Sequence, residues 1–159
     1  MATIECFEDI EAWRDARHLV KQIYEITNDG PFARDFGLGD QIRRAAVSTM
    51  SNIAEGFERG SNKDFIRFLF MAKASVGEVR SQLYTAIDLG YLEQGCVDEI
   101  TGAAQSVSRQ IAVSSSTSNP GRPEERKLRI VSQHDVSETD QGIFNLPIFN
   151  LKTFYRAIP

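Results

Sequence analysis

The chain has 159 residues, 42% of them hydrophobic, and a formal net charge of -4 from 18 Lys and Arg against 22 Asp and Glu. Such a length fits one domain, and the apolar content can form a core, while the mild acidity excludes a uniformly basic nucleic-acid-binding surface. The two cysteines and the two histidines are far apart in sequence, which excludes a disulfide framework, a Cys-x-x-Cys metal site and a His-rich metal centre.

Four stretches with helical periodicity occupy the first part of the chain. The first covers about residues 8–27, and its apolar residues recur at helical spacing. They are Ile10, Trp13, Val20, Ile23 and Tyr24. Residues 28–31, Asn-Asp-Gly-Pro, end this helix because proline cannot continue it. The second helix starts near Leu38, and its core face carries Leu38, Ile42, Ala45, Thr49, Ile53 and Gly56.

The third helix starts at Ser61, with Asp64 placed as an acidic version of the capping box. Its apolar seam alternates steps of four and three residues, which favours near-parallel packing in a bundle. The seam consists of Phe65, Leu69, Ala72, Val76, Val79, Leu83 and Ala86. Gly90 is placed to end this helix. A shorter fourth helix carries Val97, Ile100, Ala104, Val107 and Ile111.

Composition changes near residue 113, because Pro31 is the only proline before it and four more follow it. Residues 114–123, SSSTSNPGRP, are typical of a flexible linker. We therefore predict an all-α fold, an antiparallel up-down four-helix bundle over residues 1–113 with a flexible, poorly ordered C-terminal tail over residues 114–159.

A second apolar stripe runs along the third helix, roughly 100–140° from the core seam and beside Lys73 and Arg80. It consists of Ile66, Phe70, Gly77 and Tyr84. On the second helix, Val47, Met50, Ala54 and Phe57 also lie off the core seam. A wide core face is one explanation. We favour the other, self-association through the second and third helices, because exposed apolar patches usually mark interfaces.

Polar residues on the same two helices indicate a structural network. Asn52 falls on the core side of the second helix, where a buried amide needs hydrogen-bond partners. Arg44, Ser48 and Glu55 share an adjacent flank, and Glu78 lies on the third helix. We predict that these five residues fix the helix register. The alternative is a ligand pocket in the bundle, but the Glu-x-x-His pairs of di-iron carboxylate proteins are missing.

Charge is unevenly distributed, with an acidic excess over residues 5–29 and a basic excess over residues 41–80. Solvated helix faces with intrachain ion pairs explain such a pattern. The alternative is a basic face that contacts the phosphates of RNA or DNA with little sequence specificity. Its candidate residues are Arg43, Arg44, Lys63, Arg67, Lys73 and Arg80.

No feature of the sequence indicates an enzyme. His18 and His134 lie near no nucleophile motif, and residues 56–61 lack the lysine and the preceding strand of a phosphate-binding P-loop. We predict no catalytic, cofactor-binding or metal-binding residue and no small-molecule substrate. No apolar run approaches the ~20 residues of a membrane span, and the N-terminus does not have the pattern of a signal peptide. We therefore expect a cytoplasmic protein with no membrane partner.

Several segments resemble a known family. They are residues 41–48 (QIRRAAVS), 51–57 (SNIAEGF) and 59–69 (RGSNKDFIRFL), together with 7–13 and 88–92. Over about residues 5–113 the chain resembles the bacterial four-helix-bundle proteins first described as products of intervening sequences within 23S rRNA genes. One departure is Thr49-Met50, where the family usually has Ile or Val followed by proline. We expect the second helix to be straighter without that proline.

The resemblance implies a small helical protomer that assembles into a homopentameric ring or barrel, without established catalytic residues or cofactors. A related branch, the accessory protein of diversity-generating retroelements, works with a reverse transcriptase and nucleic acid. We therefore predict a non-enzymatic oligomeric scaffold, with RNA or DNA binding as the alternative.

The predicted tail lies outside the resemblance. It contains a tandem pentapeptide, IFNLP at residues 143–147 and IFNLK at residues 148–152. Apolar segments of this kind often bind in a groove of a partner, and an extension that stays disordered is the alternative. Pro147 and Pro159 argue against a helix or a central strand.

Overall fold

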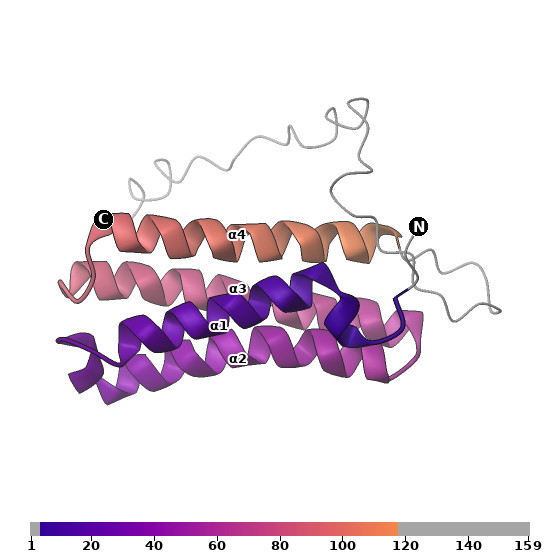
Figure 1. Cartoon of the computed structure of the whole chain (residues 1–159), viewed down its shortest axis with the longest axis horizontal. Helices are drawn as coiled ribbons and strands as arrows, with labels where there is room; N and C mark the ends of the chain where they lie inside the picture. The colour runs from indigo at the N-terminus through magenta and orange to yellow at the C-terminus, as the bar shows by residue number, and fades with distance from the viewer. Residues whose placement is uncertain (1–3, 118–159) are drawn as a thin grey trace, which may run out of the picture.

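The computed structural model describes residues 4–117, which form a bundle of helices (Figure 1). In chain order the elements are the 3-10 helix η1 (Phe7–Asp9), α1 (Glu11–Thr27), the 3-10 helix η2 (Phe32–Arg34), α2 (Phe36–Glu58), α3 (Asn62–Asp88) and α4 (Gln94–Thr117). The predicted all-α fold is confirmed. The tandem pentapeptide lies outside the described residues.

The long helices alternate in direction, as an up-down bundle requires. Each of α1 and α3 packs against both α2 and α4, so the four helices form a square in cross-section. The start of α1, the turn between α2 and α3, and the last turns of α4 lie at the same end of the bundle (Figure 1).

Local sequence signals set the ends of the helices. Asp35 Oδ1 accepts a hydrogen bond from the Leu38 N–H at 3.0 Å, so α2 starts slightly earlier than predicted. Ser61 Oγ accepts from the Asp64 N–H at 3.4 Å and starts α3 as predicted. Gly90 follows α3 with a φ of 69°, a conformation that costs little only for glycine.

The core seam of α3 is confirmed, because all seven residues predicted for it are buried. The predicted face of α1 is partly wrong. Its buried residues are Ala12, Ala16, Leu19, Ile23 and Thr27. Trp13 and Val20 are half-buried, and Tyr24 is 41% exposed. Small side chains let α1 approach its neighbours closely, so the large ones end up at the edge of the contact.

Helix α4 differs from the expectation based on composition, whereas α2 is continuous, as expected without the proline. Helix α4 continues to Thr117, so the expected boundary after residue 113 falls inside it. Ser114 is buried and its Oγ donates to the Gln110 carbonyl at 2.9 Å, which lets a serine-rich segment remain helical. Helix α2 runs without interruption through Thr49 and Met50, and the buried Thr49 Oγ1 donates to the Ala45 carbonyl at 3.1 Å.

Helices α2 and α3 approach each other closely at Gly56. A Cβ atom added there would lie 2.7 Å from Phe68 Cβ and 3.2 Å from Phe65 Cδ2. Real side chains do not tolerate the shorter of these distances, and both neighbours are buried in a close-packed interior. Glycine is therefore required at this crossing.

Arg43 ties the start of α2 to the end of α1. Its Nε donates to Thr27 Oγ1 at 2.7 Å, and its Nη2 donates to the Thr27 carbonyl at 2.6 Å and to Asn28 Oδ1 at 3.0 Å. The guanidinium carbon also lies 5.2 Å from the centroid of the Tyr24 ring. The last carbonyls of a helix lack partners within it, so Arg43 closes the C-terminal end of α1.

We expect Gly56→Ala to lower the free energy of unfolding by about 1–3 kcal/mol, because the added methyl group forces α2 and α3 apart. Urea denaturation followed by circular dichroism measures the change. The matched control is Gly102→Ala on α4, where an added Cβ meets nothing within 4 Å. This control is expected to stabilise by about 0.4–1 kcal/mol. A neutral or stabilising Gly56→Ala would contradict the close approach.

We expect Arg43→Lys to destabilise by about 1–2 kcal/mol, because a lysine ammonium cannot reproduce the three guanidinium hydrogen bonds. The neighbouring Arg44→Lys is the control, since the Arg44–Asp40 ion pair is exposed and is worth at most about 0.5 kcal/mol. The same denaturation measurement compares the two variants. Equal effects would show that Arg43 does not close the end of α1.

Candidate functional site

The apolar stripe predicted on α3 faces away from α2. Gly77 lies about 160° around the helix from Ser75, which forms a hydrogen bond to α2. Phe70 is 58% exposed, Tyr84 is 55% exposed and Gly77 is also exposed, whereas Ile66 is half-buried. Two aromatic rings on one flank of α3 are therefore accessible to a partner.

Arg80 and Lys73 lie beside this stripe. Arg80 is half-buried, and its Nε is enclosed without a hydrogen-bond partner among residues 4–117. An enclosed N–H without an acceptor costs about 1–3 kcal/mol.

The apolar residues predicted off the core seam of α2 are less accessible. Val47, Met50, Ala54 and Phe57 are all half-buried, and Met50 and Phe57 pack against the core. A wide core face, which the sequence left open, accounts for these two. The exposed apolar surface belongs mainly to α3.

The six predicted basic residues do not form one continuous surface. Arg43 closes the end of α1, Arg44 pairs with Asp40 at 2.8 Å, and Arg80 is half-buried. The members that are exposed and form no ion pair within the described part of the chain are Lys63, Arg67 and Lys73. All three belong to α3.

The structure brings together only part of the predicted polar network. Asn52 Nδ2 donates to the Ser48 carbonyl at 2.8 Å and to Ser48 Oγ at 3.0 Å. Ser48 Oγ lies 3.0 Å from Ser75 Oγ of α3, and Ser75 Oγ donates to the Met71 carbonyl. The other predicted members are separate from it: Arg44 pairs with Asp40, Glu55 pairs with Arg59, and Glu78 is exposed.

Ser75 is a network member that the sequence analysis missed. The signal for it is a row of residues spaced by seven, next to the core seam of α3: Phe68, Ser75 and Gln82. A row with the same spacing runs along α2: Gln41, Ser48 and Glu55. Because the helices are antiparallel, the bond between Ser48 and Ser75 pairs the two rows in opposite order.

We call the contact between these rows the α2–α3 seam. Its layers are Glu55 with Phe68, Ser48 with Ser75, and Gln41 with Gln82. At the first layer, the Arg59 guanidinium, which pairs with Glu55, lies 4.7 Å from the centroid of the Phe68 ring. A hydrogen bond joins the second layer. At the third layer the seam opens into a groove.

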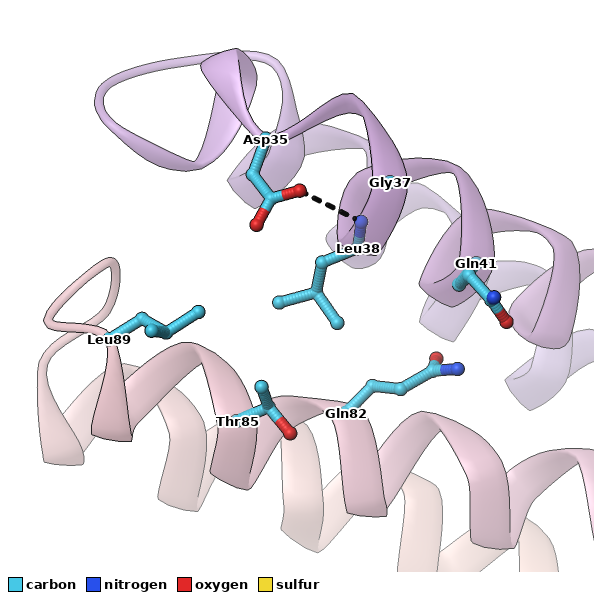
Figure 2. Close-up of a pocket in the computed structure, with 7 residues that line it drawn as sticks. All are labelled: Asp35, Gly37, Leu38, Gln41, Gln82, Thr85 and Leu89. Atoms are coloured by element: carbon cyan, nitrogen blue, oxygen red, sulfur yellow. Dashed lines mark hydrogen bonds between the residues drawn. The ribbon is translucent and has the colours of Figure 1, made fainter.

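This groove has a volume of about 290 Å³ and lies between the start of α2 and the end of α3 (Figure 2). Its lining residues are Asp35, Gly37, Leu38, Gln41, Gln82, Thr85 and Leu89. Figure 2 shows the Leu38 side chain reaching toward α3, and the carboxamides of Gln41 and Gln82 at one end of the groove. Gln82 Oε1 is buried and has no hydrogen-bond partner among residues 4–117.

Among residues 4–117, Asp35 supplies the only charged side chain of the groove lining. Its Oδ1 caps α2, and its Oδ2 accepts a hydrogen bond from the Tyr91 hydroxyl at 3.3 Å. Burial raises the pKa of Tyr91, and the Asp35 charge and this hydrogen bond raise it further, so the phenol stays protonated. With a carboxylate in its lining, the groove suits a hydrogen-bond donor or a cation.

The described cysteines are free thiols. Burial raises the pKa of Cys96, and the charges of Glu99 and Glu93 raise it further. Desolvation and hydrogen bonds with nearby carboxylates raise the pKa of Cys6. A raised pKa disfavours the reactive thiolate form.

Two further observations concern the described residues. Within 4–117, no group of three or more His, Cys, Asp or Glu side chains is placed to hold a metal ion. None of the helices in that range has both the length and the apolar composition needed to cross a membrane.

Comparison with known proteins identifies the family. The family model described as 23S rRNA-intervening sequence protein matches residues 8–113. A crystal structure of a protein with unknown function from the S23 ribosomal protein family of Bacteroides thetaiotaomicron is similar, with a TM-score of 0.58 and 20% sequence identity over 63% of this chain and 94% of that chain. At this identity the likeness concerns the fold alone. No curated protein matches the chain. Because the family model covers the bundle from α1 through most of α4, the chain belongs to the family of 23S rRNA-intervening sequence proteins.

Proposed function

We propose that the chain is a cytoplasmic, non-enzymatic scaffold that self-associates through α3, with a ring of five copies as the expected assembly. The observation that carries the proposal is the stripe on α3, where Phe70 and Tyr84 remain 58% and 55% exposed. A surface helix of a monomer needs only one apolar face, and α3 already buries its core seam.

The exposed apolar area of the stripe is large enough to contribute to the stability of an assembly. A buried aromatic side chain covers about 150–250 Å², and about half of that area is exposed on each ring. At about 25 cal/mol per Å², covering both rings contributes roughly 5 kcal/mol per protomer before the costs of association. From Ile66 to Tyr84 the stripe extends about 27 Å along the helix.

Charge supports a contact between unlike surfaces, which a closed ring of more than two copies needs. The exposed Lys73 and the half-buried Arg80 border the stripe and give this flank positive charge. Residues 5–29 carry an acidic excess, so the first helix of a neighbouring copy offers carboxylates of the required sign.

We expect light scattering on the wild-type chain to give a mass of roughly 90 kDa, five times the 17.8 kDa of one protomer. Phe70→Glu should shift the mass toward that of a single protomer, because it places a charge in the middle of the contact. The control is Phe36→Glu on α2, which changes a phenylalanine that is 83% exposed but lies outside the stripe. A wild-type mass near 17.8 kDa would contradict the proposal, as would a Phe70→Glu variant that assembles like the wild type.

Binding of RNA or DNA is the second candidate function. It is favoured by the exposure of Lys63, Arg67 and Lys73 along α3, without ion pairs in the described part of the chain. The family description refers to 23S rRNA, which makes RNA the first partner to test. Ring assembly would repeat these three charges in every copy and strengthen the local field.

For this candidate we expect binding to an RNA hairpin at low salt that weakens steeply as salt is added, because phosphate contacts release counterions. Replacing Lys63, Arg67 and Lys73 together with Gln should flatten the slope of log K against log salt by roughly 2 units. Fluorescence anisotropy measures both slopes. The matched control replaces Arg14, Arg17 and Lys21 on α1 with Gln. Binding that is indifferent to salt, or equal loss in both triple variants, would count against RNA contact through α3.

A further inference from the structure

The groove at the Gln41–Gln82 layer is separate from the surface used in the proposed self-association. The stripe faces away from α2, whereas the groove lies between α2 and α3. Leu38 and Leu89 form apolar walls, and Leu89 is 52% exposed. A partner in the groove therefore leaves the stripe accessible.

The volume of the groove limits the kind of occupant. About 290 Å³ lies just below the ~300–1,000 Å³ of pockets that enclose cofactors and drug-sized ligands. One or two large side chains of a peptide fit such a space.

The chemistry of the lining defines what this peptide must offer. The walls favour apolar side chains, and the carboxamides of Gln41 and Gln82 at one end of the groove favour an amide that can hydrogen-bond with them. The Asp35 carboxylate favours a positive charge nearby. A strongly acidic peptide is therefore excluded.

One segment of the chain itself has this composition. Residues 143–152 repeat Ile-Phe-Asn-Leu, so each copy offers large apolar side chains together with an asparagine amide that donates N–H. From residue 141 to residue 159 there is no acidic residue, and Lys152 and Arg156 supply positive charge.

The chain is long enough for this segment to reach the groove. Helix α4 ends at Thr117, at the opposite end of the bundle from the groove. Helix α3 has 27 residues, which at 1.5 Å per residue gives a distance of about 40 Å to cover. Residues 118–142 span up to roughly 80 Å when extended. A tethered segment also has an effective concentration in the millimolar range, which favours it over a free competitor.

We infer that the groove between the start of α2 and the end of α3 binds the tandem pentapeptide, residues 143–152, of the same chain. Phe and Leu side chains of the repeat pack between Leu38 and Leu89, and an asparagine amide forms hydrogen bonds with the carboxamides of Gln41 and Gln82. The groove is thus an internal docking site for the C-terminal segment, independent of the α3 stripe.

Photo-cross-linking in the full-length chain tests this inference. Thr85, which lines the groove and is exposed, is replaced with benzoylphenylalanine, and Ala74, exposed on α3 about 16 Å away along the helix, is replaced in a control. After irradiation and trypsin digestion, position 85 should cross-link to the peptide of residues 130–152 and position 74 should not. In an equal mixture of ¹⁵N-labelled and unlabelled chains, the two peptides of each cross-linked pair should be either both labelled or both unlabelled, because they come from the same chain.

Tail variants show whether the repeat itself is recognised. Phe144→Asp combined with Phe149→Asp should lower the yield of the cross-link from position 85 by at least about fivefold. Ile130→Asp, an apolar change in the same tryptic peptide but outside the repeat, should leave it unchanged. No cross-link, equal cross-linking from position 74, or a yield unaffected by the two phenylalanine substitutions would overturn the inference. Pairs with mixed labels would assign the segment to another copy and overturn docking within one chain.

The outcome is separable from that of the proposed assembly. The phenylalanine substitutions in the tail should leave the mass measured by light scattering unchanged. A monomeric wild-type chain that still cross-links from position 85 would retain the docking site and reject the scaffold. An assembled chain without the cross-link would support the scaffold and reject the docking site.

Discussion

The arrangement of this bundle depends on how closely α2 and α3 approach each other at Gly56. Because no Cβ occupies the space 2.7 Å from Phe68 Cβ, the two backbones come near enough for short side chains to meet. Ser48 and Ser75 then form a hydrogen bond across the contact. That bond places Ser48 opposite Ser75, and the antiparallel direction of the helices decides which residues face each other along the rest of the seam.

The two flanks of α3 consequently differ in chemistry. On the side of α2, a polar seam is closed at two layers and open at the third, where Gln82 Oε1 has no partner among the described residues. On the other flank, Phe70 and Tyr84 are exposed beside Arg80. The Nε of Arg80 is enclosed and has no hydrogen-bond partner among the described residues. One helix thus carries a partly polar groove on one flank and two exposed aromatic rings on the other, and substitutions can alter each flank alone.

Several features of the fold and the site could be read from the sequence, and others could not. The core seam of α3 was predictable because its apolar residues are large and regularly spaced. The buried face of α1 was not, since Ala12 and Ala16 carry little hydrophobic signal although they are the residues that allow close packing. The helical start of the serine-rich segment was missed because Ser114 bonds back to the Gln110 carbonyl, which composition does not reveal.

The sequence by itself determined the four helices, their main stop and start signals and the core seam of α3, because these features depend on residues within about two turns of one another. Only the tertiary structure decided the roles of the polar residues. Arg43 has its partner Thr27 on a different helix, 16 positions away, and Ser48 has Ser75 27 positions away. The rotation of each helix about its axis determines whether such residues meet, and that rotation is set by packing at contacts such as Gly56 against Phe68.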